Sequence, residues 1–237
     1  MVKSDGKVLL IVPAYNEQES ILSTCRLIME YANGYDLIVI NDGSTDNTER
    51  ILDENHIPHI ELVENLGIGG AVQTGYRYAL ENGYDVAVQF DGDGQHDIES
   101  VEDLVRPVLD GEADMVIGSR FIKKDLENFR SSAARRAGIK ILSGMIKWKT
   151  GRRIYDTTSG FRAAGREVIR LFAGEYSSEY PEPISTAQAL LNGYKIAEIP
   201  AKMKSRSGGK SSISGIHTSI YYMVNVFLCI IVLRRKK

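Results

Sequence analysis

The chain has little cysteine, little net charge and no long hydrophobic run. Its two cysteines, Cys25 and Cys229, lie far apart in apolar segments, which argues against a disulfide framework or a zinc site and fits a reducing compartment. A formal net charge of -2 gives no reason to expect nucleic acid as a partner. The 237 residues, 43% of them hydrophobic, are enough to bury a full core in what is most simply one globular domain.

The two ends of the chain differ in hydrophobic character. The apolar run at residues 8–12 is far too short for a signal peptide. Residues 216–233 are mostly apolar but are interrupted by polar residues, and a basic cluster follows at 234–237. Because a membrane-spanning helix needs about 20 apolar residues, we expect this helix to lie in the membrane surface or to insert partly, with its basic cluster on anionic lipid. The alternative is a core helix with a solvated tail.

Strand and helix patterns alternate along the first half of the chain. Apolar runs predict strands at residues 8–13, 37–40, 60–63, 86–90 and 115–117. Helical patterns fall between them at residues 19–31, from a capping-box-like start at 46, at 68–80 and at 98–109. Such alternation predicts parallel strands with crossover helices. In the second half, residues 121–136 are loop-like, residues 139–146 show an apolar period and residues 156–162 are rich in turn residues. A helix is predicted at residues 183–191 and a strand at residues 196–199.

Two carboxylates stand where the strand at residues 86–90 stops. Asp91 and Asp93 lie one residue apart, and ligands of open α/β sheets bind at the carboxyl ends of the strands. Neighbouring acids repel each other unless a cation lies between them, and oxygen ligands suit Mg²⁺ or Mn²⁺. The pair therefore predicts a metal-held diphosphate, with a solvated acidic turn as the alternative.

The turns after the first two predicted strands also carry polar side chains. Tyr15 could cover a nucleobase and Glu17 could accept from ribose or base, or this segment is a plain helix-start turn. Asp42 could accept from a nucleobase N–H, or it belongs to an N-cap turn. The glycines of residues 65–70 precede a helix, so their amides could face phosphate. That segment lacks the last glycine of a dinucleotide fingerprint, and residues 204–211 lack the first glycine of a P-loop.

Six ordered motifs carry a family resemblance. They are PAYNE (13–17), NDGSTDNT (41–48), NLGIGGAVQTGY (65–76), DGDGQHD (91–97), GSRF (118–121) and DTTSGFR (156–162). From residue 8 to residue 220 the chain resembles the family-2 glycosyltransferases of GT-A fold, and within them the branch of polyprenyl- and dolichol-phosphate sugar synthases. The resemblance implies an α/β, Rossmann-like, mostly parallel sheet flanked by helices.

The resemblance also implies roles for individual residues. The nucleotide sugar would be bound by Pro13, Ala14, Tyr15, Glu17, Asp42, Gly70, Asp91, Gly92 and Asp93. The ion, Mg²⁺ or Mn²⁺, would be held by Asp91, Asp93 and Gln95. Phosphate or acceptor contacts would come from Ser119, Arg120, Arg206, Lys210 and Ser211. Arginine suits this role because it grips phosphate oxygens through two N–H groups.

The catalytic residues follow from the same resemblance. Relatives place a carboxylate before a helix that leads to a Gly-Tyr turn, at the position where this chain has Ile184. We therefore expect Glu182 to be the base, with Glu179 as the second candidate, and Asp93 to be catalytic through the metal.

The implied function is inverting transfer of a sugar from a UDP- or GDP-linked donor to polyprenyl phosphate, such as undecaprenyl phosphate, in cell-surface glycan synthesis. Two alternatives remain: the same transfer onto a saccharide hydroxyl of a lipid-linked glycan, and a non-catalytic nucleotide-sugar-binding subunit. We expect a catalytic domain at residues 1–215 and a membrane-associating helix with a basic tail at residues 216–237. The expected location is the cytoplasmic face of the cell membrane, with a small membrane protein or a second copy of the chain as a further partner.

Overall fold

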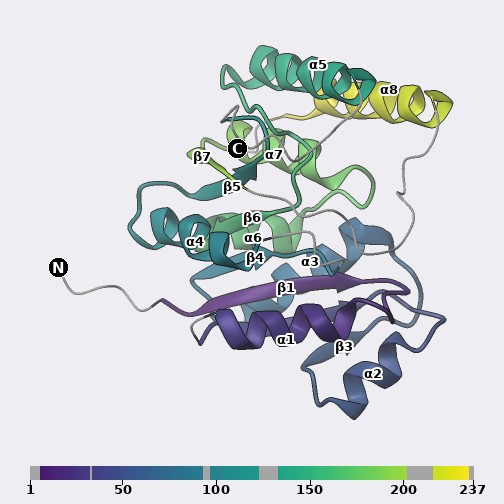
Figure 1. Cartoon of the computed structure of the whole chain (residues 1–237). Helices are drawn as coiled ribbons and strands as arrows, with labels where there is room; N and C mark the ends of the chain where they lie inside the picture. The colour runs from purple at the N-terminus through teal and green to yellow at the C-terminus, as the bar shows by residue number, and fades with distance from the viewer. Residues whose placement is uncertain (1–5, 33, 93–96, 123–132, 202–215, 235–237) are drawn as a thin grey trace.

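A sheet of seven strands in the order β3-β2-β1-β4-β6-β5-β7 forms the centre of the protein, with helices on both faces (Figure 1). The computed structural model describes residues 6–32, 34–92, 97–122, 133–201 and 216–234. The strands are β1 (Val8–Ala14), β2 (Asp36–Asn41), β3 (His59–Glu61), β4 (Val86–Gln89), β5 (Met115–Ser119), β6 (Arg162–Gly165) and β7 (Ile196–Pro200). The helices are α1 (Ile21–Tyr31), α2 (Thr48–Glu54), α3 (Gly67–Glu81), α4 (Val101–Leu109), α5 (Ala133–Thr150), α6 (Arg166–Gly174), α7 (Pro181–Leu191) and α8 (Ile216–Val232), with a 3-10 turn at Ile98–Ser100.

The strands at the centre of the sheet are buried on both faces, and β1 is buried along its whole length. Leu10 and Val12 pack with the apolar residues of α1 and α4, whereas Leu9 and Ile11 pack with those of α3 and α6. Gly75 of α3 allows the close approach of helix and sheet, since a Cβ there would lie 2.2 Å from Ile11 Cγ2. Strands covered on both faces need nearly continuous apolar runs, which is why the sequence predicted them.

β6 is reversed relative to its neighbours. It pairs antiparallel with β4 and with β5, while the other strand pairs in this sheet are parallel. Its first residue, Arg162, therefore lies opposite Gln89, the last residue of β4. The sequence did not predict β6, because the strand Arg-Ala-Ala-Gly contains no β-branched or aromatic residue, and α6 was also not predicted.

Several predicted boundaries were wrong by a few residues. β3 ends at Glu61, so Val63 lies outside the strand and is fully exposed. The predicted capping box does not form, because the N-cap of α2 is Asn47 and the Asp46 N–H donates to Asn16 Oδ1 at 3.2 Å and not to Glu49. The helix expected at residues 98–109 is divided into the 3-10 turn and α4.

The predicted C-terminal helix is confirmed as α8, which packs beside α5 and against α7 (Figure 1). Val226 and Ile230 are fully buried in this packing, and Lys149 of α5 donates through Nζ to the Ile231 carbonyl at 2.6 Å. Phe227 and Leu228, on the same helix, are exposed. Within the described segments, no helix has the length and apolar character needed to cross a membrane. α8 therefore contributes to the core on one side and presents apolar side chains on the other.

Candidate active site

The loops that follow β1 and β2 are joined by hydrogen bonds. Asn16, at a φ of 55°, donates through its N–H to the Ser44 hydroxyl at 2.9 Å and accepts through Oδ1 from the Asp46 N–H at 3.2 Å. The Glu17 N–H donates to the Thr48 hydroxyl at 2.9 Å. The two loops predicted to bind the nucleotide therefore form one unit at the carboxyl edge of the sheet.

The predicted nucleotide residues of the first loop lie in different environments. Pro13 and Ala14 are the buried last residues of β1, whereas Tyr15 is 48% exposed and can reach a ligand. The Glu17 carboxylate accepts from the Ser20 hydroxyl at 2.6 Å, just before α1. The Glu17 carboxylate therefore has a hydrogen-bond partner within the protein, independent of any contact with ribose or base.

Asp42 lies just beyond β2 and caps the start of α3. Its Oδ1 accepts from the Leu66 N–H at 2.7 Å. Burial raises the pKa of the Asp42 carboxyl, and hydrogen bonds from the N–H groups of Leu66 and Gly67 oppose this shift. Both interpretations of Asp42 therefore remain compatible with its position, since it caps a helix at the edge where a nucleobase would bind.

The glycine-rich start of α3 serves close packing at one position. A Cβ on Gly69 would lie 2.1 Å from the Ser177 carbonyl oxygen, so glycine here lets the segment before α7 touch the helix. Gly70 follows in the first turn of α3, where its predicted role toward the nucleotide sugar stays a prediction.

The turn after β4 is held against α1 and β1. The Gly92 carbonyl accepts from the buried Thr24 hydroxyl at 3.0 Å. A Cβ on Gly92 would lie 3.1 Å from the Pro13 carbonyl oxygen. This packing brings Asp91 to the same edge as the two joined loops.

The surroundings of Asp91 fit a divalent ion. The side chain is partly buried, and a Cβ on Gly160 would lie 3.2 Å from both of its carboxylate oxygens, so any larger residue at position 160 would crowd the carboxylate. Oxygen donors of this kind suit Mg²⁺ or Mn²⁺. Asp93 and Gln95, the other predicted ligands, lie outside the described residues. In the part of the chain that is described, no group of three or more acidic, histidine or cysteine side chains is placed to hold a metal.

Of the two candidate bases, Glu182 is the one within electrostatic reach of Asp91. Burial raises the pKa of the Glu182 carboxyl, the positive charge of Arg162 lowers it, and the negative charge of Asp91 raises it again. Glu179 is exposed in the loop before α7. Ile184, at the position where relatives carry an acid, is 6% exposed in the first turns of α7.

A buried arginine and a buried glutamine interact with the carboxylates of Asp91 and Glu182. Arg162, which is 0% exposed, donates through Nη1 to the Ser185 hydroxyl at 3.0 Å. Gln89, which is 1% exposed, accepts from the Tyr176 hydroxyl and donates to Asp91 Oδ1, both at 3.5 Å. A buried cation is tolerated when acids and acceptors surround it, and here Arg162 offsets part of the negative charge of the site.

The predicted phosphate residues after β5 have partners within the protein. Arg120 donates through Nε and Nη2 to the two oxygens of Asp156 at 2.7 Å each, and the two side chains are 5% and 0% exposed. Glu198 accepts from the Asp156 N–H at 2.9 Å and is hydrogen-bonded to the side chain of Ser119. The role of Arg120 toward phosphate stays a prediction. The other three predicted phosphate residues, Arg206, Lys210 and Ser211, lie outside the described residues.

Sequence reasoning assigned no role to four residues of this cluster. Gln89 had a signal, because it is a polar residue inside an apolar strand. Asp156, Gly160 and Arg162 belong to the DTTSGFR motif, but the reversed strand that brings Arg162 beside Gln89 could not be predicted.

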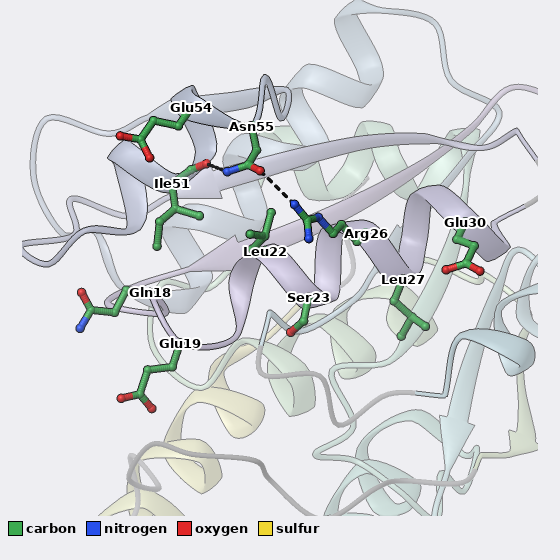
Figure 2. A pocket seen from close by; sticks show the side chains of 10 residues that line it. All are labelled: Gln18, Glu19, Leu22, Ser23, Arg26, Leu27, Glu30, Ile51, Glu54 and Asn55. Carbon is green, nitrogen blue, oxygen red and sulfur yellow. Dashed lines mark hydrogen bonds between the residues drawn. The ribbon is translucent and has the colours of Figure 1, made fainter.

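A separate surface hollow lies between α1 and α2 (Figure 2). Polar and charged side chains line most of it, and Arg26 donates to Asn55 Oδ1 there at 3.3 Å. None of the described residues predicted for the site lines this hollow. The described residues predicted for the site therefore lie away from this hollow.

Comparison with known proteins agrees with the motifs. The family model described as Glycosyl transferase family 2 matches residues 9–172. The chain is 30% identical to the UDP-N-acetylglucosamine–dolichyl-phosphate N-acetylglucosaminyltransferase of Methanococcus voltae, over 84% of this chain and 86% of that protein. It is 30% identical to the polyprenol monophosphomannose synthase of Mycolicibacterium smegmatis, over 90% of this chain and 83% of that protein.

A solved structure shows the same fold. Glucosyl-3-phosphoglycerate synthase from Mycobacterium tuberculosis, in complex with UDP, superposes with a TM-score of 0.69 at 19% identity, covering 98% of this chain and 82% of that chain. The same enzyme has also been crystallised with Mn²⁺. The sheet, its flanking helices and the family match agree, and the chain belongs to glycosyltransferase family 2 with a GT-A fold.

Proposed function

We propose that this protein transfers a sugar from a nucleotide-diphosphate sugar to a polyprenyl phosphate and inverts the anomeric carbon. The observation that carries the proposal is that Asp42 and Asp91 follow the carboxyl ends of β2 and β4, the two neighbours of β1, and that Glu182 at the start of α7 is within electrostatic reach of Asp91. Two relatives at 30% identity are named for sugar transfer to dolichyl phosphate and for synthesis of polyprenol monophosphomannose, which supports this acceptor class.

The donor would lie along the carboxyl edge from β2 to β4. Tyr15 and Asp42 would contact the nucleobase, and Asp91 with Asp93 and Gln95 would hold Mg²⁺ or Mn²⁺ on the diphosphate. When bound, the ion would neutralise the negative charge that grows on the leaving diphosphate. A UDP-linked sugar is the first donor to test, because UDP appears in the name of one relative and in the solved structure.

The chemistry itself needs few groups. An oxygen of the acceptor phosphate attacks the anomeric carbon from the face opposite the diphosphate, and the electrons of the breaking C–O bond leave with the nucleoside diphosphate. An ionised phosphate needs no base, whereas a saccharide hydroxyl would have to lose a proton. Glu182 would be the base that takes that proton, so the loss of rate on replacing Glu182 distinguishes the proposed acceptor from the saccharide hydroxyl.

The surface formed by α5 and α8 suits contact with a lipid membrane. Trp148 of α5 is 72% exposed, and Phe227 and Leu228 of α8 are 43% and 54% exposed. Lys147 and Arg152 lie exposed at the end of α5, where they would meet anionic headgroups. We propose that this face rests on the cytoplasmic surface of the membrane, where a polyprenyl phosphate presents its head.

Transfer is tested by incubating the protein with a panel of UDP- and GDP-linked sugars, polyprenyl phosphate and Mn²⁺, and identifying the lipid product by mass. The expected product is polyprenyl phosphate plus one sugar, formed with one donor far more than with the others. Asp93→Ala should abolish metal-dependent product formation. Product found on an added lipid-linked glycan and not on polyprenyl phosphate would support the alternative acceptor and overturn this one.

A further inference from the structure

Gln89 occupies an unusual place for an amide. It is the last residue of β4 and lies opposite Arg162 of the reversed strand β6. It precedes Asp91 by two residues, so alternation along an extended chain favours the same face of the sheet for both side chains. At 1% exposure, the amide needs partners for its hydrogen-bonding groups.

Those partners are a hydroxyl and two carboxylates. The Gln89 oxygen accepts from the Tyr176 hydroxyl at 3.5 Å, and its nitrogen donates to Asp91 Oδ1 at 3.5 Å. The Gln89 side chain is also hydrogen-bonded to Glu182. An amide NH₂ has two hydrogens, so the Gln89 nitrogen can donate to Asp91, just after β4, and also interact with Glu182 at the start of α7.

The amide is confined from two sides. A Cβ on Gly160 would lie 2.9 Å from Gln89 Nε2, so the backbone of residue 160 closes one side. Tyr176 is itself held, because its ring centroid lies 5.5 Å from that of Tyr76 and 5.1 Å from that of Phe172. The hydroxyl therefore fixes which end of the amide faces the acids.

The shared donor acts on both acids at once. Asp91 and Glu182 carry like charges that repel each other, and the Gln89 NH₂ group, which donates to Asp91 and interacts with Glu182, offsets part of this repulsion. Groups that orient a metal ligand through hydrogen bonds typically change metal affinity or activity by about 10–100-fold when removed.

We propose that Gln89 is a positioning residue, which holds the Asp91 carboxylate in the orientation that receives the divalent ion and fixes its distance to Glu182. This inference rests on the proposed function, because it assumes that Asp91 is a metal ligand.

The test compares Gln89→Met with wild type and with Gln188→Met. Gln188 is also a largely buried glutamine that donates to a carboxylate, that of Glu175 at 3.0 Å, so its variant measures the cost of losing this kind of bond elsewhere. Mn²⁺ binding is measured in the presence of UDP from the electron paramagnetic resonance signal of free Mn²⁺, together with the melting temperature and kcat. Gln89→Met should weaken Mn²⁺ binding about tenfold or more and lower kcat, while Gln188→Met should leave Mn²⁺ binding unchanged.

A purely structural role would lower the melting temperature of both variants and leave Mn²⁺ affinity at the wild-type value, which would overturn the proposal. Tyr176→Phe keeps the amide and removes the hydroxyl that orients it. If Gln89→Met does not fold, this second variant decides, with a loss of Mn²⁺ affinity of a few fold supporting the proposal and no loss refuting it. Absence of transfer by wild type with every donor would instead contradict the proposed function, and the Mn²⁺ titration would still decide the role of Gln89.

Discussion

Replacing Asp156 by asparagine should destabilise the protein strongly, because Asp156 is half of a buried ion pair. Its carboxylate accepts from Arg120 through Nε and Nη2 at 2.7 Å each and from the Arg120 N–H at 3.0 Å. The side chains of Arg120 and Asp156 are 5% and 0% exposed, so water cannot solvate the Arg120 guanidinium when the negative charge of Asp156 is removed. Removing one partner of a buried pair costs about 3–5 kcal/mol, and we take about 3 kcal/mol for asparagine because it keeps one acceptor oxygen.

The expected shift follows from the size of the chain. At about 2–4 °C for each kcal/mol in a protein of this length, Asp156→Asn should lower the melting temperature by about 6–12 °C. Differential scanning calorimetry measures this directly. The matched control is Glu54→Gln, which breaks an Arg50–Glu54 pair whose side chains are 67% and 63% exposed, and pairs of this kind contribute less than about 1 kcal/mol. Equal shifts in the two variants would refute the assignment of Arg120 and Asp156 as a buried pair that holds the loop of residues 156–160.

Three further outcomes follow from the site and from the exposed helices. Gly160→Ala should lower kcat/KM about tenfold or more, because the new Cβ would lie 2.9 Å from Gln89 Nε2. The control Gly144→Ala should keep full activity, because its Cβ would meet nothing within 4 Å. Equal activity of the two variants would contradict this reasoning. Glu182→Gln should lower transfer to polyprenyl phosphate by less than about tenfold but transfer to a saccharide hydroxyl by about 10²–10⁴-fold, as measured by initial rates with each acceptor. The fluorescence of Trp148, the single tryptophan, should shift to shorter wavelength with phosphatidylglycerol vesicles and not with phosphatidylcholine vesicles, and an unchanged spectrum in both would argue against a membrane role for the face formed by α5 and α8.

The parallel part of the sheet could be predicted because its physical requirements are local. A strand buried on both faces must be apolar throughout, and β1 and β4 satisfy this in the sequence. The ends of such strands then locate the ligand edge, so Asp42 and Asp91 could be placed without coordinates. Glu182 was selected ahead of Glu179 from the family resemblance and not from the strand pattern; the structure places it within electrostatic reach of Asp91, and its role as the base stays a prediction.

The rest depends on contacts between distant parts of the chain. β6 has no local strand signal, and its reversal is what sets Arg162 opposite Gln89. The partner of Arg120 lies 36 residues further along the chain, at Asp156, so no local pattern could predict that pair. Two glycines show the same limit. Gly69 contacts the segment before α7 and Gly160 lies against Gln89, and the residues adjacent to each glycine in the sequence do not predict either contact.

The central claim is that the protein transfers a sugar to a polyprenyl phosphate and that the Asp91 carboxylate, just after β4, is required for this transfer. The most direct measurement is the amount of glycosylated polyprenyl phosphate formed by wild type and by Asp91→Asn, quantified by mass spectrometry with Mn²⁺ and the preferred donor, alongside the melting temperature of both proteins. The account predicts a lipid product with wild type and a loss of about 100-fold or more with Asp91→Asn, at a similar melting temperature. Wild-type rates in the variant would contradict the account, and so would the absence of lipid product with every donor.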